Sequence, residues 1–131
     1  ASQTATGRPI CLYQKDVREL QLANGAIRAG INILLQAAGI KPMQLQSILL
    51  AGGFGNFIRR SNAQRIGMLP PIPHERIRFV GNTSSYGAKR ALLSTAEREY
   101  ASRVIGITTH LDLSLNTNFQ QEFSEAMLFP E

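Results

Sequence analysis

The chain has 131 residues, of which 44% are hydrophobic and 18% charged, with a formal net charge of +5. These values indicate one globular domain, and no stretch approaches the ~18 consecutive apolar residues of a membrane span. A single cysteine, Cys11, excludes an internal disulfide and a cysteine-based metal or iron–sulfur site within the chain. The basic residues are scattered and adjoin only at Arg59-Arg60 and Lys89-Arg90, so we expect no binding to nucleic acid or to membranes.

The polar start of the chain, residues 1–9, is predicted to be disordered. Residues 10–13 are apolar and predict a short strand, in which Cys11 would be a buried, inert thiol. One reduced cysteine is compatible with a reducing compartment, so we expect a cytoplasmic protein.

A long helix is predicted over residues 16–38, because Asp16 and Glu19 form a capping-box pattern and Gly39 gives a stop signal. Gly25 and Gly30 lie inside this helix, where each costs about 1 kcal/mol relative to Ala. Such glycines indicate that another group packs closely against this helix, more commonly another helix and less commonly a flat ligand. Apolar residues at spacings of three and four predict the core-facing stripe: Val17, Leu20, Ala23, Ile27, Ile31, Leu34 and Ala38.

The central stretch of the chain is a short apolar run that stops abruptly at three glycines. Residues 48–51 predict a buried strand, and Gly52, Gly53 and Gly55 follow it at once. At the carboxyl end of a strand, such glycines let the backbone approach a ligand, often a phosphate; a tight turn without a ligand explains them equally well. The spacing matches neither a P-loop nor the dinucleotide fingerprint.

The remaining pattern alternates strands with helices. His74 and His110 have no partner at metal-ligand spacing and are expected to be exposed in loops. The predicted elements are a helix over 62–67 capped by Ser61 or Asn62, a strand over 77–80 ended by Gly81, a helix from 83 to about 94, its continuation over 97–103, a third strand over 104–107, and a last helix with an aromatic core stripe at Phe119, Phe123 and Met127. This order predicts an α/β fold with a mostly parallel sheet, in which both glycine turns share one edge and form one crevice.

Several of these segments, taken together and in order, resemble one known family. They are residues 13–23, 50–56, 62–70, 79–82 and 119–127. From about residue 10 to its end, the chain resembles the carboxyl-terminal part of the reductive activators of corrinoid proteins.

This resemblance implies an α/β, ribonuclease H-like (actin-type ATPase) subdomain over residues 10–131, with a short, mostly parallel sheet and flanking helices. The parent would be an iron–sulfur ATPase that returns inactivated corrinoid proteins to Co(I). ATP and Mg²⁺ would bind the intact parent, and a [2Fe–2S] cluster would occupy its amino-terminal domain. The fragment alone is expected to hold no cofactor and no metal, and to lack catalytic residues, because the phosphate-binding Asp-Gly hairpins of the superfamily are missing.

The resemblance also implies nucleotide-binding residues on two segments. The family often has Lys at the position of Asn24, so no cationic contact is expected there. The implied nucleotide-binding residues of the glycine turn are Gly52, Gly53, Phe54 and Gly55, on the adenosine and α-phosphate side. Those of the long helix are Asn24, Gly25 and Arg28, near the adenine or ribose.

The expected partners are a corrinoid protein and the rest of the chain's own ATPase domain, with possible self-association of the fragment. An alternative hypothesis is a non-catalytic docking module whose basic surface binds an acidic partner. A self-standing enzyme is not supported, because the sequence has no Ser/His/Asp set, no Cys/His pair and no paired carboxylates in a plausible cleft.

Overall fold

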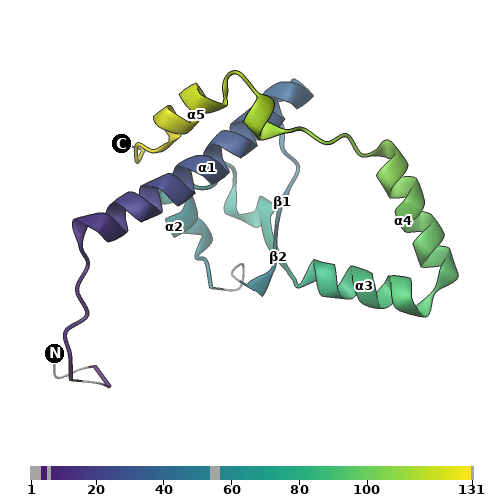
Figure 1. Ribbon diagram of the computed structural model, residues 1–131, viewed down its shortest axis with the longest axis horizontal. Helices are drawn as coiled ribbons and strands as arrows, with labels where there is room; N and C mark the ends of the chain where they lie inside the picture. Colours follow the sequence, from purple (N-terminus) through teal and green to yellow (C-terminus); the bar gives the residue numbers. More distant parts are fainter. Residues whose placement is uncertain (1–3, 6, 54–56, 131) are drawn as a thin grey trace.

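The computed structural model describes residues 4, 5, 7–53 and 57–130. The chain is α/β, as predicted, and has seven regular helices and strands within the described residues (Figure 1). They are α1 (Gln14–Ala38), β1 (Ile48–Ala51), α2 (Arg60–Arg65), β2 (Ile77–Gly81), α3 (Thr83–Leu93), α4 (Thr95–Ile107) and α5 (Phe119–Ala126), with short 3₁₀ turns at Pro42–Gln44, His74–Arg76 and Leu113–Leu115.

The two strands pair in parallel and place their apolar side chains on a common core. Ile48 lies opposite Ile77 and Leu50 opposite Phe79. The carboxamide of Gln64 on α2 donates hydrogen bonds to the carbonyls of Pro70 (2.9 Å) and Ile72 (2.7 Å), which fixes the proline-rich connector against this helix. The core consists of Ala63, Leu69, Ile72 and Ile77, with Ile31, Ile48, Leu50, Ile58 and Met68 packed against them.

α5 packs along α1, although about 80 residues separate the two helices in the sequence (Figure 1). The carboxylate of Glu122 on α5 accepts hydrogen bonds from the side-chain amides of Asn32 (2.9 Å) and Gln36 (2.6 Å) on α1. The predicted aromatic stripe on α5 is half-buried, and the rings of Phe119 and Phe123 stack with centroids 5.9 Å apart. The C-terminal segment is thereby held against the long helix.

The start of α1 differs from the prediction. Tyr13 is the N-cap, and Asp16, in the third helical position, accepts a hydrogen bond from the Tyr13 backbone N–H at 2.8 Å. Asp16 therefore reaches back to the cap and is not itself the cap. The stop at Gly39 is confirmed, because this residue has a φ of 66° and its N–H bonds to the last turn.

The strand predicted over residues 10–13 is wrong. These residues have no regular secondary structure, and the side chain of Ile10 is 90% exposed. The prediction that Cys11 is buried is also wrong, because its thiol is exposed. The segment runs away from the two-stranded sheet (Figure 1), so its backbone has no strand to pair with.

The stripe predicted to face the core from α1 is largely open. Leu20, Ile27 and Leu34 are 42%, 47% and 56% exposed. The residues that α1 buries are mostly small: Asn24, Gly25, Ala29, Gly30, Ile33 and Leu35. α1 is packed between α5 on one side and the connector after α2 on another, and small residues let both approach closely.

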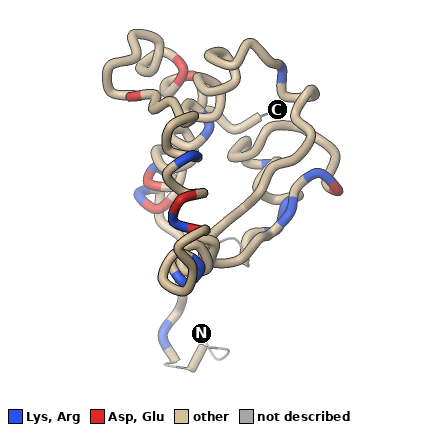
Figure 2. Tube along the Cα trace, turned by 90° about the vertical axis from the view of Figure 1, so that its right-hand side faces the viewer, with Lys and Arg blue, Asp and Glu red and all other residues tan. Residues whose placement is uncertain are grey.

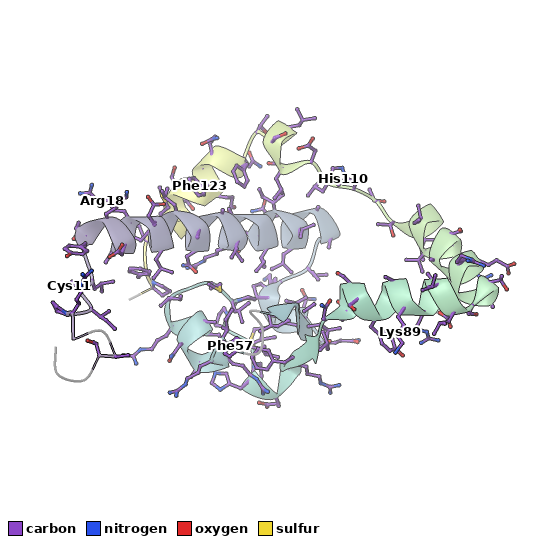
Figure 3. The ribbon with its side chains drawn as sticks, turned by 60° about the horizontal axis from the view of Figure 1, so that its bottom comes forward. Cys11, Arg18, Phe57, Lys89, His110 and Phe123 are labelled. Carbon is purple, nitrogen blue, oxygen red and sulfur yellow. The ribbon has the colours of Figure 1, made fainter. Side chains whose placement is uncertain are left out.

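α3 and α4 form a helical arm, residues 83–107, that extends away from the rest of the chain (Figures 1 and 3). Asn82 caps α3 by accepting a hydrogen bond from the Ser85 N–H at 3.0 Å, and Ser94 caps α4 in the same way. Arg90 on α3 forms an ion pair with Glu97 on α4. The third strand predicted over 104–107 is wrong, because these residues form the last turn of α4.

Lys and Arg are spread over several elements, in agreement with the scatter along the sequence (Figure 2). His74 and His110 are both exposed, as predicted. Within the described residues, none of the helices combines the length and the apolar character that crossing a membrane requires.

Candidate functional site

The two strands end side by side at a pair of glycines with left-handed backbone conformations. Gly52 follows β1 with a φ of 92°, and Gly81 ends β2 with a φ of 68°. The Gly52 N–H donates a hydrogen bond to the Gly81 carbonyl at 2.8 Å. A side chain would strain the backbone at either position, so glycine is required at both. We call Gly52, Gly53, Gly81 and Asn82 the glycine edge.

The backbone at the glycine edge is open to approach from outside. Among the described residues, and apart from its own chain neighbours, a Cβ atom built on Gly52, Gly53 or Gly81 would meet no atom within 4 Å. Gly53 and Asn82 are exposed, whereas Gly52 and Gly81 are half-buried. The Asn82 side chain is already used as the cap of α3. The prediction that both glycine turns lie at one edge of a parallel sheet is confirmed by the parallel pairing of β1 and β2. That the two turns form one crevice stays a prediction.

The other residues predicted for this turn, Phe54 and Gly55, lie outside the described residues. Gly81 was not among the predicted binding residues, although it completes the edge. The sequence feature that could have indicated Gly81 is the Gly81-Asn82 pair at the end of the second apolar run. This pair corresponds to Gly52-Gly53 after the first apolar run.

The predicted residues of α1 lie in packed surroundings. Asn24 is fully buried, and its Nδ2 donates a hydrogen bond to the Ile66 carbonyl at 2.6 Å, while its Oδ1 has no partner within the described residues. A Cβ atom on Gly25 would lie 2.9 Å from Cγ of Met127. The structure thus gives Gly25 a role in helix packing, the more common of the two explanations for a helical glycine. A nucleotide contact by Asn24 or Gly25 stays a prediction.

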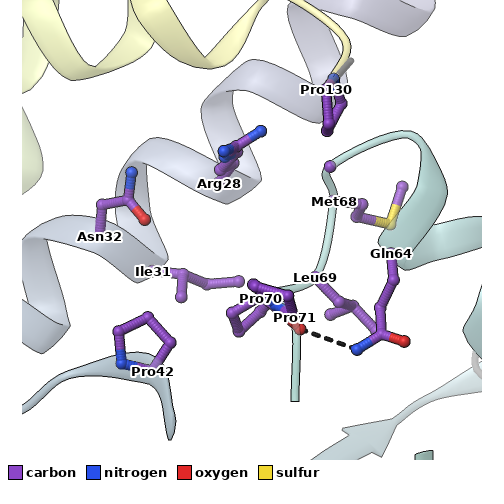
Figure 4. A pocket seen from close by; sticks show the side chains of 11 residues that line it. Arg28, Ile31, Asn32, Pro42, Gln64, Met68, Leu69, Pro70, Pro71 and Pro130 are labelled. Carbon is purple, nitrogen blue, oxygen red and sulfur yellow. Dashed lines mark hydrogen bonds between the residues drawn. The ribbon is translucent and has the colours of Figure 1, made fainter. Parts of the chain in front are cut away.

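Arg28 lies one turn further along α1 and lines the pocket shown in Figure 4. The pocket measures about 220 Å³ and lies between α1, the connector after α2 and Pro130. The guanidinium group of Arg28 occupies the space in front of Gly67, where a Cβ atom would collide with it. Among the described residues, Asn32 and Gln64 add polar groups to a wall that is otherwise largely apolar.

Groups with displaced pKa values lie away from the glycine edge. The pKa of Asp112 is lowered chiefly by the hydrogen bond from the Ser114 hydroxyl, and the pKa of Arg90 is raised chiefly by its hydrogen bond to Glu97. Within the described residues, no three His, Cys, Asp or Glu side chains come together as a possible metal site. In the described part of the chain, the glycine edge thus presents backbone groups and no acid–base pair.

Comparison with known proteins shows to which family the chain belongs. The family model described as the C-terminal domain of RACo, the ASKHA domain, matches residues 1–131. The chain therefore belongs to this family, and both the predicted fold class and the predicted resemblance to corrinoid activators are confirmed.

Three relatives describe the family further. The chain is 39% identical over 129 residues to the corrinoid activation enzyme RamQ of Eubacterium limosum, a match that covers 98% of this chain and 22% of the relative. It is 34% identical over 87 residues to the [Co(II) methylated amine-specific corrinoid protein] reductase of Methanosarcina barkeri, covering 66% of this chain and 16% of the relative. A solved structure, of a reductive activator for corrinoid, iron–sulfur protein, superposes with a TM-score of 0.88 at 31% identity, covering 99% of this chain and 21% of the other.

The chain thus spans about one fifth of the length of RamQ and of the solved activator. These relatives do not favour the alternative hypothesis of a non-catalytic docking module whose basic surface binds an acidic partner.

Proposed function

We propose that the chain is the carboxyl-terminal part of an ATP-driven activator of corrinoid proteins, and that its glycine edge forms the adenosine side of the ATP site. The observation that carries this proposal is the pair of left-handed glycines, Gly52 and Gly81, hydrogen-bonded across adjacent strand ends with open space in front of their backbones. The descriptions of the relatives, all of which concern corrinoid activation or reduction, supply the reaction class.

In this proposal the chain binds and orients the nucleotide. ATP would lie against Gly52 and Gly53, with Phe54 and Gly55 alongside, and Asn24, Gly25 and Arg28 would contribute from α1. A side chain at Gly53 would occupy the space that the nucleotide needs, which explains a glycine at a position where the backbone does not demand one.

The ATP-driven step requires groups that this chain does not supply. When bound, ATP with Mg²⁺ would supply the free energy that drives electron transfer to the corrinoid cobalt. The Mg²⁺ ligands and the carboxylate that activates water would come from the preceding part of the ATPase domain. The single cysteine, Cys11, does not fit a [2Fe–2S] cluster, so the cluster would belong to a separate amino-terminal domain. The partners would be a corrinoid protein and the rest of the ATPase domain, in the cytoplasm.

The test is the substitution Gly53→Val in the full-length polypeptide that carries this chain. Gly53 does not have a positive φ, and a Cβ atom on it would meet none of the described residues within 4 Å. The chain should therefore fold with valine at this position, and the methyl groups of the valine should fill the nucleotide position. We expect calorimetric titration with Mg·ATP to show at least a tenfold loss of affinity, equivalent to about 1.4 kcal/mol. The thermal unfolding temperature should stay unchanged.

A matched control is Ala37→Val, because Ala37 is exposed on α1 and lies outside both the glycine edge and the helical arm. This variant should bind Mg·ATP like the parent. Normal ATP binding by the Gly53→Val variant would show that the glycine edge is not part of the site.

A further inference from the structure

Two hollows adjoin where α1 faces the connector after α2. The first is the pocket of Figure 4, which measures about 220 Å³, and the second is a more open hollow of about 620 Å³. Gln64 and Pro130 line both of them. Arg28 lines the first hollow, and Arg65 and His74 line the second. We call the two hollows together the basic groove.

The basic side chains of the groove have no partner. Within the described residues, the side chains of Arg28, Arg65 and His74 form neither a hydrogen bond nor an ion pair. In the same part of the chain, neither hollow is lined by Asp or Glu. Arg28 is half-buried, so its guanidinium has lost part of its contact with water without gaining an acceptor. An anion in the groove would supply the acceptors that these donors lack.

Two carboxylates lie near Arg28 without pairing with it. On the α5 side, Arg28 borders a smaller hollow of about 80 Å³ together with Glu122 and Glu125. Glu122 already accepts hydrogen bonds from two side-chain amides of α1, and Glu125 accepts one from Gln121 at 3.0 Å. Among the described residues, neither carboxylate lies within ion-pair distance of Arg28. The guanidinium therefore stays available to a ligand on the connector side.

Gly67 allows Arg28 and Pro130 to come together beside the junction of the two hollows. Gly67 has a φ of 77°, and a Cβ atom on it would lie 2.5 Å from Nη1 of Arg28 and 3.0 Å from Cγ and Cδ of Pro130. Pro130 lines both hollows, so the guanidinium that lies against Gly67 is close to both. A side chain at Gly67 would displace the charge from this place.

The first hollow offers a rigid apolar wall next to this charge. Four of the six prolines of the chain line it: Pro42, Pro70, Pro71 and Pro130. The proline ring fixes φ, and Gln64 holds the connector through the carbonyls of Pro70 and Ile72. A wall that is already formed loses little freedom when a ligand binds. At about 220 Å³ the hollow is smaller than the roughly 300–1,000 Å³ of drug-sized pockets, so it suits an organic group of about one ring.

We propose that the basic groove binds a small organic phosphate monoester. Its organic group packs on the proline wall, and its phosphate lies at the junction, between Arg28 on α1 and the side chains of Arg65 and His74. Guanidinium groups bind phosphate oxygens through paired hydrogen bonds. Two guanidinium groups and an imidazole match the three terminal oxygens of a monoester better than the two oxygens of a carboxylate.

The basic groove is a different site from the glycine edge. The glycine edge lies at the carboxyl ends of β1 and β2, whereas Pro42 and Pro70 precede the amino ends of these strands. None of the residues of the glycine edge lines either hollow. The inference therefore goes beyond the proposed function. Arg28 is common to the two proposals, and Arg65 and His74 belong to the groove alone.

The experiment is calorimetric titration of phenyl phosphate into the full-length polypeptide that carries this chain, with and without saturating Mg·ADP. We expect saturable binding that Mg·ADP does not weaken, and weaker binding of inorganic phosphate, which has no ring to pack on the wall. Arg28→Gln and Arg65→Gln should each lower the affinity for phenyl phosphate about tenfold, because each removes a charged donor. Arg65 is exposed on α2, so its replacement should keep the fold and leave Mg·ATP binding unchanged.

Arg18→Gln is the matched control, since Arg18 is an exposed arginine of α1 that lies outside the groove. This variant should bind phenyl phosphate like the parent. An equal loss in this control, or no loss in the Arg65→Gln variant, would overturn the proposal. Displacement of phenyl phosphate by Mg·ADP would also overturn it, and the proposed function would still stand. Normal ATP binding by the Gly53→Val variant, together with phenyl phosphate binding that depends on Arg65, would support the groove and remove the proposed function.

Discussion

Asn24 shows how a single buried polar residue can join distant parts of the chain. It is the buried polar side chain of α1, and its Nδ2 holds the carbonyl of Ile66 at the end of α2. The hydrogen bond spans 42 positions in the sequence and fixes the loop that carries Gly67 and the connector. We therefore assign Asn24 a structural role within the described chain, in addition to any contact with nucleotide.

The substitution Asn24→Ala should lower the free energy of unfolding of the chain by about 1–3 kcal/mol. It removes the donor and leaves the Ile66 carbonyl without this partner in a site closed to water. Urea unfolding followed by circular dichroism would measure the change. Asn62→Ala is a suitable control, because Asn62 is exposed on α2 and its replacement should change stability by no more than about 0.5 kcal/mol. Equal stability of the Asn24→Ala variant and the parent would contradict the structural role.

At the scale of elements, the glycine inside α1 and the glycine inside α3 have different packing surroundings. Gly25 faces the C-terminal segment, where a Cβ atom would lie 2.9 Å from Cγ and 3.3 Å from the backbone nitrogen of Met127. A Cβ atom on Gly87 would meet none of the described residues within 4 Å. Both are helical glycines in the sequence, and only their neighbours distinguish them.

Alanine at these two positions should therefore have opposite effects in the 131-residue chain. Gly25→Ala should destabilise it by about 1–3 kcal/mol, because Met127 and its backbone must move. Gly87→Ala should stabilise helix α3 by about 0.5–1 kcal/mol, because alanine loses less backbone entropy there. Paired denaturation curves, with helicity at 222 nm as the signal, would measure both changes. A stabilising Gly25→Ala would mean that α5 does not pack on α1 as closely as the structure has it.

At the scale of the whole molecule, the chain has the features expected if it forms one side of a larger structure, as proposed. Its sheet has only two strands within the described residues, and an isolated two-stranded sheet is marginal without further packing. The large exposed surface and the open glycine edge agree with this interpretation.

The 131-residue chain should accordingly bind Mg·ATP at least tenfold more weakly than the full-length polypeptide, or give no measurable heat. A site that lacks its opposite wall loses the contacts that would enclose the ligand. Parallel calorimetric titrations at low and moderate salt would measure the difference. Affinity equal to that of the full-length polypeptide would show that the chain contains a complete site.

The sequence determined those features that depend on a few adjacent residues. Glycines directly after an apolar run set the ends of β1 and β2, and Gly39 set the end of α1, because backbone sterics act over one turn or less. The ordered motifs also identified the family, although the chain spans only about one fifth of the length of RamQ.

Tertiary structure alone decided which surfaces are buried and which apolar runs become strands. Residues 104–107 are rich in β-branched side chains and suited a strand, but they continue the helix that Ser94 caps, and no described strand is available to pair with them. The apolar stripe of Leu20, Ile27 and Leu34 stays open, because α5 and the connector pack on the sides of α1 where small residues allow close approach. Periodicity indicates the direction of side chains around a helix, but burial depends on neighbours that are far away in the sequence.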